Sequence, residues 1–110
     1  MDDLDINPMG SLVIRNFRHG NKRSSLKLEA ELWDALHEIV GELKLSENKV
    51  LSALADYKET NNYEHGDGTF TSLVRVFIVN AIRKGISKLI HFRDMSGEDL
   101  SFFILAVFRG

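Results

Sequence analysis

The chain has no cysteine and a single proline among its 110 residues. Without cysteine it forms neither disulfides nor thiolate metal sites, and its composition does not indicate an oxidising compartment. Its apolar runs fall well short of the roughly 20 residues that a membrane-spanning helix needs. The N-terminal segment MDDLDINPMG is acidic and polar, unlike a signal peptide. From these absences we expect a cytoplasmic protein that does not bind membranes.

Acidic residues are missing from residues 7–28, and this absence is the most informative one. The whole chain carries 16 Asp and Glu against 14 Lys and Arg, which gives a net charge of -2. The acid-free segment nevertheless holds a group of basic residues: Arg15, Arg18, Lys22, Arg23 and Lys27. Positive charge gathered in one segment of a slightly acidic chain predicts a local contact with nucleic-acid phosphates.

The size and composition are those of one small globular domain. Hydrophobic residues make up 44% of the chain and charged residues 27%, which is ordinary for a globular protein. A domain of this length has a limited core, and self-association is one way to complete it.

Residues 11–28 predict a β-hairpin. The β-branched and aromatic side chains of residues 11–18 favour extended backbone, and Gly20 can adopt the positive φ of a tight turn. Residues 22–28, KRSSLKL, alternate in type, and strand side chains alternate between two faces. One face therefore carries Leu26 and Leu28. The other face carries Arg23, Ser25 and Lys27.

Three helices are predicted after the hairpin. Apolar residues recur at helical spacing over residues 29–43. Ser46 is a good N-cap for a second helix that runs to about Tyr57. Residues 61–68 form a loop by composition. Thr69 or Thr71 can cap a third helix to about Lys84, although its β-branched content also permits a strand.

The last segment leaves its secondary structure open. Residues 100–108, LSFFILAVF, are apolar on every side. They predict a buried helix, a buried strand or an element that contacts another subunit. Ser96 followed by Asp99 is similar to the start of a capping box, with Asp in place of the usual Glu.

Two short motifs stand in a suggestive order. Arg23-Ser-Ser-Leu-Lys-Leu-Glu29 is followed by Leu32-Trp33 and Leu36, and Ser72-Leu-Val-Arg75-Val-Phe77 comes later. This order, between Gly20 and Lys84, resembles the ribbon-helix-helix DNA-binding proteins, the superfamily of the Arc and methionine repressors. More narrowly, it resembles a bacterial subfamily with a Thr-Ser-x-x-Leu-Glu strand end and a Phe-Trp in the first helix. Ser24 stands for that Thr and Leu32 for that Phe.

The resemblance implies an α+β fold and an intertwined homodimer whose paired strands enter the major groove of double-stranded DNA. The base-contacting residues would be Arg23, Ser25 and Lys27. The phosphate-contacting residues would be Lys22, Arg15, Arg18, Ser46, Asn48 and Lys49. The dimer core would hold Leu26, Leu28, Leu32, Trp33 and Leu36. Glu47 departs from the expected phosphate anchor at the second helix, because its charge repels phosphate, and the start of the third helix is the rival anchor.

Some segments go beyond the minimal ribbon-helix-helix fold. We expect residues 1–10 to form a flexible acidic tail, residues 11–84 the DNA-binding domain, and residues 85–110 a C-terminal extension. The extra N-terminal strand would widen the ribbon to four strands in the dimer or place Arg15 and Arg18 on flanking phosphates. The C-terminal helices would extend the core, support a dimer of dimers or contact a protein partner.

No catalytic pattern is present in the sequence. It has no cysteine nucleophile, no glycine-rich phosphate loop and no recognisable Ser–His frame. The four histidines show no ligand spacing, and Glu64, His65 and Asp67 are more typical of a solvated loop than of a metal site. We therefore expect no enzyme activity, no cofactor and no metal.

The sequence predicts a sequence-specific DNA-binding protein that acts as a transcriptional repressor. Within the same class, an antitoxin would use the ribbon to regulate its own operon and the C-terminal region to wrap a toxin. An assembly module whose strands pair with a protein and never touch DNA is the alternative from another class.

Overall fold

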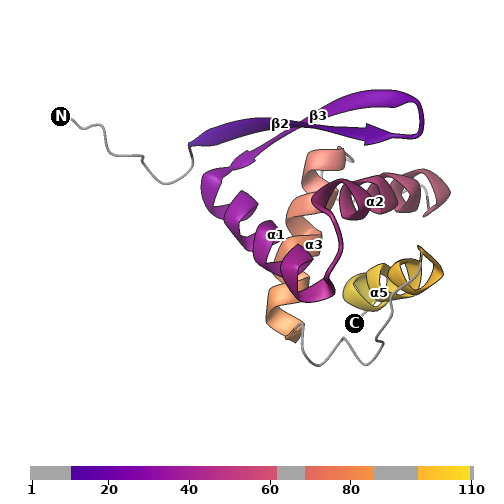
Figure 1. Cartoon of the computed structure of the whole chain (residues 1–110). Helices are drawn as coiled ribbons and strands as arrows, with labels where there is room; N and C mark the ends of the chain where they lie inside the picture. The colour runs from indigo at the N-terminus through magenta and orange to yellow at the C-terminus, as the bar shows by residue number, and fades with distance from the viewer. Residues whose placement is uncertain (1–10, 62–68, 86–96, 110) are drawn as a thin grey trace.

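The computed structural model describes residues 11–61, 69–85 and 97–109. Two antiparallel strands form a hairpin that extends across one side of a group of helices (Figure 1). The elements are β2 (Leu12–His19), β3 (Lys22–Glu29), α1 (Ala30–Leu43), α2 (Glu47–Asn61), α3 (Phe70–Lys84) and α5 (Gly97–Arg109). This order confirms the predicted α+β architecture of a hairpin followed by helices.

The hairpin closes through a two-residue turn. His19 pairs with Lys22, so Gly20 and Asn21 are the connecting residues. Gly20 has a φ of 66°, whereas Asn21 does not adopt positive φ. A glycine with positive φ at the first turn position is the pattern of a type II′ turn, whose twist matches that of the flanking strands. The turn fixes the register along the hairpin, including the pairs Arg15–Leu26 and Phe17–Ser24.

Caps define the ends of the first two helices. α1 ends at Lys44, whose left-handed conformation (φ 59°, ψ 41°) directs its backbone N–H to the carbonyls of Val40 and Gly41. The Ser46 hydroxyl accepts a hydrogen bond of 3.0 Å from the Lys49 N–H, as predicted for the N-cap of α2. α2 continues to Asn61, four residues beyond the predicted end at Tyr57. The intervening residues contain no glycine or proline to stop the helix.

The two C-terminal elements are helices. Thr69, and not Thr71, caps α3, because its hydroxyl accepts a hydrogen bond of 3.0 Å from the Ser72 N–H. Gly85 follows α3 with a φ of 81°. α3 is a helix, as predicted, and not the strand that its β-branched content also permitted, and α5 resolves the open assignment of the last apolar segment as a helix. Asn61, which was predicted to begin the loop, is instead the last residue of α2. The rest of the predicted 61–68 loop, with Glu64, His65 and Asp67, the predicted acidic tail and the Ser96 cap lie outside the described residues.

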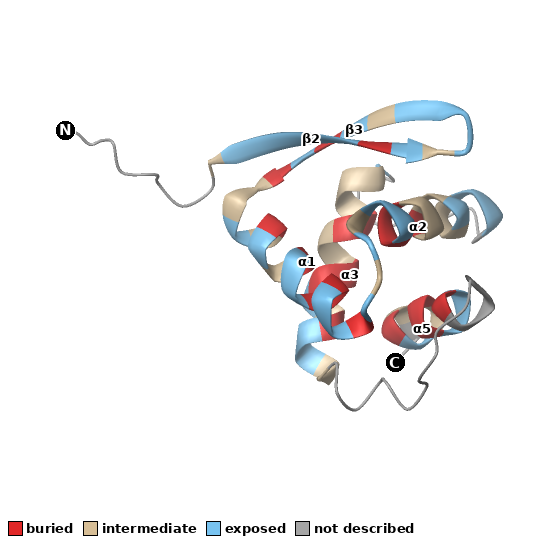
Figure 2. Ribbon diagram, in the orientation of Figure 1, coloured by how far each residue is buried: buried red, intermediate tan, exposed pale blue. Residues whose placement is uncertain are grey.

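One hydrophobic core joins the hairpin to the helices. It takes Leu26 and Leu28 from β3, and four side chains of α5, including Phe103, are buried in it. The Phe77 ring of α3 packs edge-on against Phe103, with ring centroids 6.3 Å apart. Figure 2 shows this burial along the inner sides of the helices, whereas most of the hairpin is exposed.

Candidate nucleic-acid interface

The hairpin has one face toward the helices and one toward solvent. Residues directly opposite one another in an antiparallel pair share a face, and neighbours along a strand alternate. The pairing of Phe17 with Ser24 and of Arg15 with Leu26 therefore defines the inner face. Phe17, Leu26 and Leu28 are all buried on it. The predicted DNA-reading residues belong to the opposite, outer face.

The outer face combines residues from both strands. Arg23, Ser25 and Lys27 of β3 are all exposed there, so the structure brings the three predicted base-contacting residues together. In register, they lie opposite Arg18, Asn16 and Ile14 of β2, which are also exposed. We call these six residues the outer face of the hairpin.

Sequence reasoning did not include Asn16 and Ile14 among the functional residues. The signal that would have found them is the turn: once Gly20 and Asn21 are its two residues, the pairing of Asn16 with Ser25 and of Ile14 with Lys27 follows. Both add chemistry that suits a DNA groove, because Asn can bond adenine bidentately and an apolar side chain can contact the thymine methyl group.

Arg15 differs from the other basic residues of the hairpin. Its guanidinium lies 4.9 Å from the centre of the Trp33 ring and 3.6 Å from a carboxylate oxygen of Glu47. These contacts direct its side chain toward the helices. Arg15 was predicted to contact phosphate together with Arg18, but the alternation of the strand places the two on opposite faces. Lys22 is exposed beside the turn.

The start of α2 is used to hold the hairpin. The Asn48 side chain accepts a hydrogen bond of 2.7 Å from the Arg18 N–H and donates one of 3.1 Å to the Arg18 carbonyl. It thus occupies backbone groups on the outer edge of β2. Ser46 caps the helix, and Lys49 is exposed. Of the three predicted phosphate-contacting residues at this helix, only Lys49 has a side chain that makes no hydrogen bond or ion pair among the described residues.

Glu47 is the acidic residue that departs from the family's phosphate anchor. One of its carboxylate oxygens faces Arg15, as described above, and the other is buried with no hydrogen-bond partner among the described residues. The negative charge of Glu47 thus offsets the positive charge of Arg15, which lies on the inner face. The positive charge of the outer face is not reduced by this pair.

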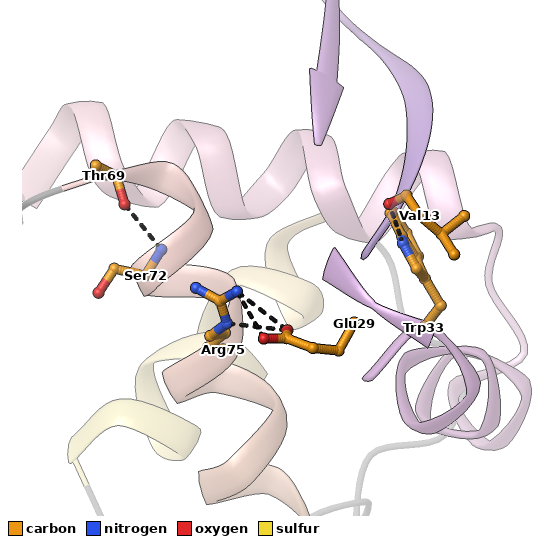
Figure 3. Close-up of polar contacts among 6 residues, drawn as sticks. All are labelled: Val13, Glu29, Trp33, Thr69, Ser72 and Arg75. Carbon is orange, nitrogen blue, oxygen red and sulfur yellow. Dashed lines mark hydrogen bonds and ion pairs between the residues drawn. The ribbon is translucent and has the colours of Figure 1, made fainter. Parts of the chain in front are cut away.

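The predicted dimer-core residues are packed within one chain. Leu26, Leu28, Trp33 and Leu36 are buried, and Leu32 packs against the same core with partial exposure. The Trp33 indole N–H donates a hydrogen bond of 2.8 Å to the Val13 carbonyl, which ties α1 to β2 (Figure 3). Burial of these side chains therefore does not require a second chain.

An ion pair connects the two motifs that carried the family resemblance. The Arg75 guanidinium donates to both carboxylate oxygens of Glu29, at 3.0 to 3.2 Å, and joins the end of β3 to α3 (Figure 3). The pKa of Glu29 is lowered, first by a hydrogen bond from its own backbone N–H and then by Arg75. Sequence reasoning named Arg75 in a motif but gave it no partner, since 46 residues separate the two.

Comparison with protein families identifies the chain. The model of the family described as "Ribbon-helix-helix domain" matches residues 12–82, which is more than half of the chain, and the chain belongs to this family. The match begins with β2, so the added strand lies inside the family domain. No curated protein and no solved structure gives a significant match. Ribbon-helix-helix domains are typically DNA-binding regulators without enzymatic activity, and the family supports DNA binding for this chain.

The described part of the chain contains no helix that is both long enough and apolar enough to span a membrane.

Proposed function

We propose that the protein is a cytoplasmic transcriptional repressor that binds a specific DNA sequence with the outer face of its hairpin. The observation that carries the proposal is the joint exposure of Arg23, Ser25 and Lys27 on a face that also holds Arg18 and Asn16. Arginine and lysine bond guanine, asparagine bonds adenine, and serine bonds several bases. A two-stranded ribbon is an element that the major groove, about 12 Å wide, admits.

The protein acts as a homodimer in this proposal, and the edges of the hairpin suggest how it forms. Asn48 occupies the edge of β2 at Arg18. β3 has no second neighbouring strand within the described residues. An unpaired strand edge is a template for pairing with another chain. We therefore place two β3 strands side by side at the centre of the dimer, with one β2 strand on each flank.

This arrangement divides the outer face into two roles. The central strands present two copies of Arg23, Ser25 and Lys27 to the bases. The flanking strands lie toward the DNA backbones, where Arg18 contacts phosphate. Lys22, the first residue of β3, is exposed beside the turn and contacts phosphate from that end of the hairpin. Lys49 at the start of α2 is a further candidate for a phosphate contact.

Alanine variants in a binding assay test the division of roles. Because the operator is unknown, footprinting on the DNA upstream of the protein's own gene provides the target. Arg23→Ala and Lys27→Ala should each weaken specific binding by about 1–3 kcal/mol and relax the preference at one base position. Arg18→Ala should weaken binding to all DNA sequences alike. It should also reduce the slope of log affinity against log salt concentration by about 1.

Arg83→Ala is the matched control. Arg83 is exposed near the end of α3, so the variant removes the same charge from another part of the surface. Arg83→Ala should leave the DNA-sequence preference unchanged. Equal affinity of wild type, Arg23→Ala and Lys27→Ala for the operator would contradict the proposal. Failure to bind any duplex at low salt would instead favour the protein-assembly alternative.

The structure gives the antitoxin alternative less support than the sequence did. That alternative needs a C-terminal segment that is available to wrap a toxin. Leu100, Phe103, Ile104 and Val107 of α5 are instead buried in the chain's own core. Phe102 is the exposed exception among the large apolar side chains of α5. A repressor with a folded C-terminal helix therefore accounts better for the described residues.

A further inference from the structure

Three side chains that commonly bind metals meet near the tip of the hairpin. His19 is the last residue of β2, and Asp56 and Glu59 lie three residues apart on α2. One donor atom from each of the three residues can be chosen so that all lie within 4.8 Å of one another. The His19 Nε2 atom is 2.6 Å from an Asp56 carboxylate oxygen, and its Nδ1 atom is 3.8 Å from a Glu59 oxygen.

The fold holds the histidine in place and leaves the carboxylates adjustable. The Gly20 turn and the Asn48 hydrogen bonds to Arg18 fix the backbone on both sides of His19. Its side chain is only 18% exposed, whereas those of Asp56 and Glu59 are 67% exposed. A metal ion binds one nitrogen of an imidazole, and the two carboxylates face different ring nitrogens. One of the two exposed carboxylates must therefore swing toward the nitrogen that the other faces to complete the site.

The donor set has the chemistry of a divalent-metal site. Neutral imidazole and carboxylates bind first-row divalent metals, with metal–donor distances near 2.0–2.2 Å for zinc. Three protein donors leave further positions for water. The two carboxylates place two negative charges beside the imidazole, and a divalent cation compensates them. Lys22 lies opposite His19 in the hairpin register and is a competing positive charge, but it is exposed and free to turn away.

We propose that His19, Asp56 and Glu59 form a binding site for one divalent first-row transition-metal ion, which cross-links the tip of the hairpin to α2. In the absence of the ion, the hydrogen bond between His19 and Asp56 holds the same two elements together. The ion replaces this one contact with three coordinate bonds. This proposal does not depend on DNA binding, because the free protein is sufficient to test it.

Zn²⁺ titration of the full chain is the direct experiment. EDTA first removes bound metals, and buffer exchange then removes the EDTA. Calorimetry of the resulting protein should show one Zn²⁺ bound per chain. Thermal unfolding should shift upward by about 12 °C with Zn²⁺ at about a hundred times its Kd. His19→Ala should abolish both signals. Asp56→Asn and Glu59→Gln should each weaken binding by at least about tenfold.

Two controls keep the result interpretable. His37→Ala removes an exposed histidine of α1 that belongs to no group of three metal-binding side chains among the described residues, and it should bind Zn²⁺ like the wild type. Because Asp56 and Glu59 are exposed, their variants should fold even if His19→Ala does not, and circular dichroism checks this. Absence of binding to the wild type would overturn the proposal. So would binding that survives in Asp56→Asn and Glu59→Gln, since another site would then account for it.

Discussion

Replacing Asn48 with alanine removes both hydrogen bonds that hold the edge of β2 on α2. These bonds, of 2.7 and 3.1 Å, connect an exposed side chain to the backbone of Arg18. A hydrogen bond of this kind contributes a net 0.5–1.5 kcal/mol, so losing two should lower the free energy of unfolding by about 1–3 kcal/mol. For a domain of this size, the loss corresponds to a fall in Tm of roughly 4–13 °C.

Urea unfolding, followed by far-UV circular dichroism, measures the effect. Asn16→Ala is the matched control, because Asn16 belongs to the same strand but its side chain is on the exposed outer face. It should change the free energy of unfolding by no more than about 0.5 kcal/mol. If Asn48→Ala were as stable as the wild type, the contact would not hold the hairpin. Weaker binding to all DNA sequences without lost stability would indicate that Asn48 contacts phosphate instead.

The remaining predictions concern stability. Since the pKa of Glu29 is lowered, its contribution is fully present above the ordinary glutamate pKa and is lost as the pH falls through the lowered value. Unfolding free energies of wild type and Glu29→Gln should therefore differ at neutral pH and converge in acid, and a difference that is constant with pH would refute this. Gly41→Ala should raise the free energy of unfolding by about 0.5–1 kcal/mol, because an added Cβ meets no atom within 4 Å. Lys44→Gly should raise it by about 1 kcal/mol by relieving the left-handed conformation; urea unfolding measures both. Phe77→Ala should cost about 3–5 kcal/mol, since the ring is fully buried, and a calorimetric loss below 1 kcal/mol would contradict its place in the core.

Local patterns made the elements predictable. The alternation over residues 22–28 identifies β3 and separates its two faces because strand side chains have a period of two. Gly20, Ser46 and Gly85 mark a turn, a helix start and a helix end through chemistry that acts within a few residues. The ordered motifs then led to the family that the comparison established.

Long-range packing made other features unpredictable. Placing the Arg15 side chain required knowing which face of β2 is buried. That face depends on the turn, which sets the register of β2 with β3. The helical state of α5 could not be read from a segment that is apolar on every side, because burial on all sides erases the periodic signal.

The sequence by itself determined the order of the elements, the alternating faces of β3 and the local concentration of positive charge. Each follows from neighbouring residues, whose spacing fixes their geometry. Only the tertiary structure decided which residues meet from distant segments. It pairs Glu29 with Arg75, uses Asn48 to hold β2, and brings His19 to Asp56 across 37 residues. Such contacts depend on how the hairpin docks on the helices, and no local pattern encodes that docking.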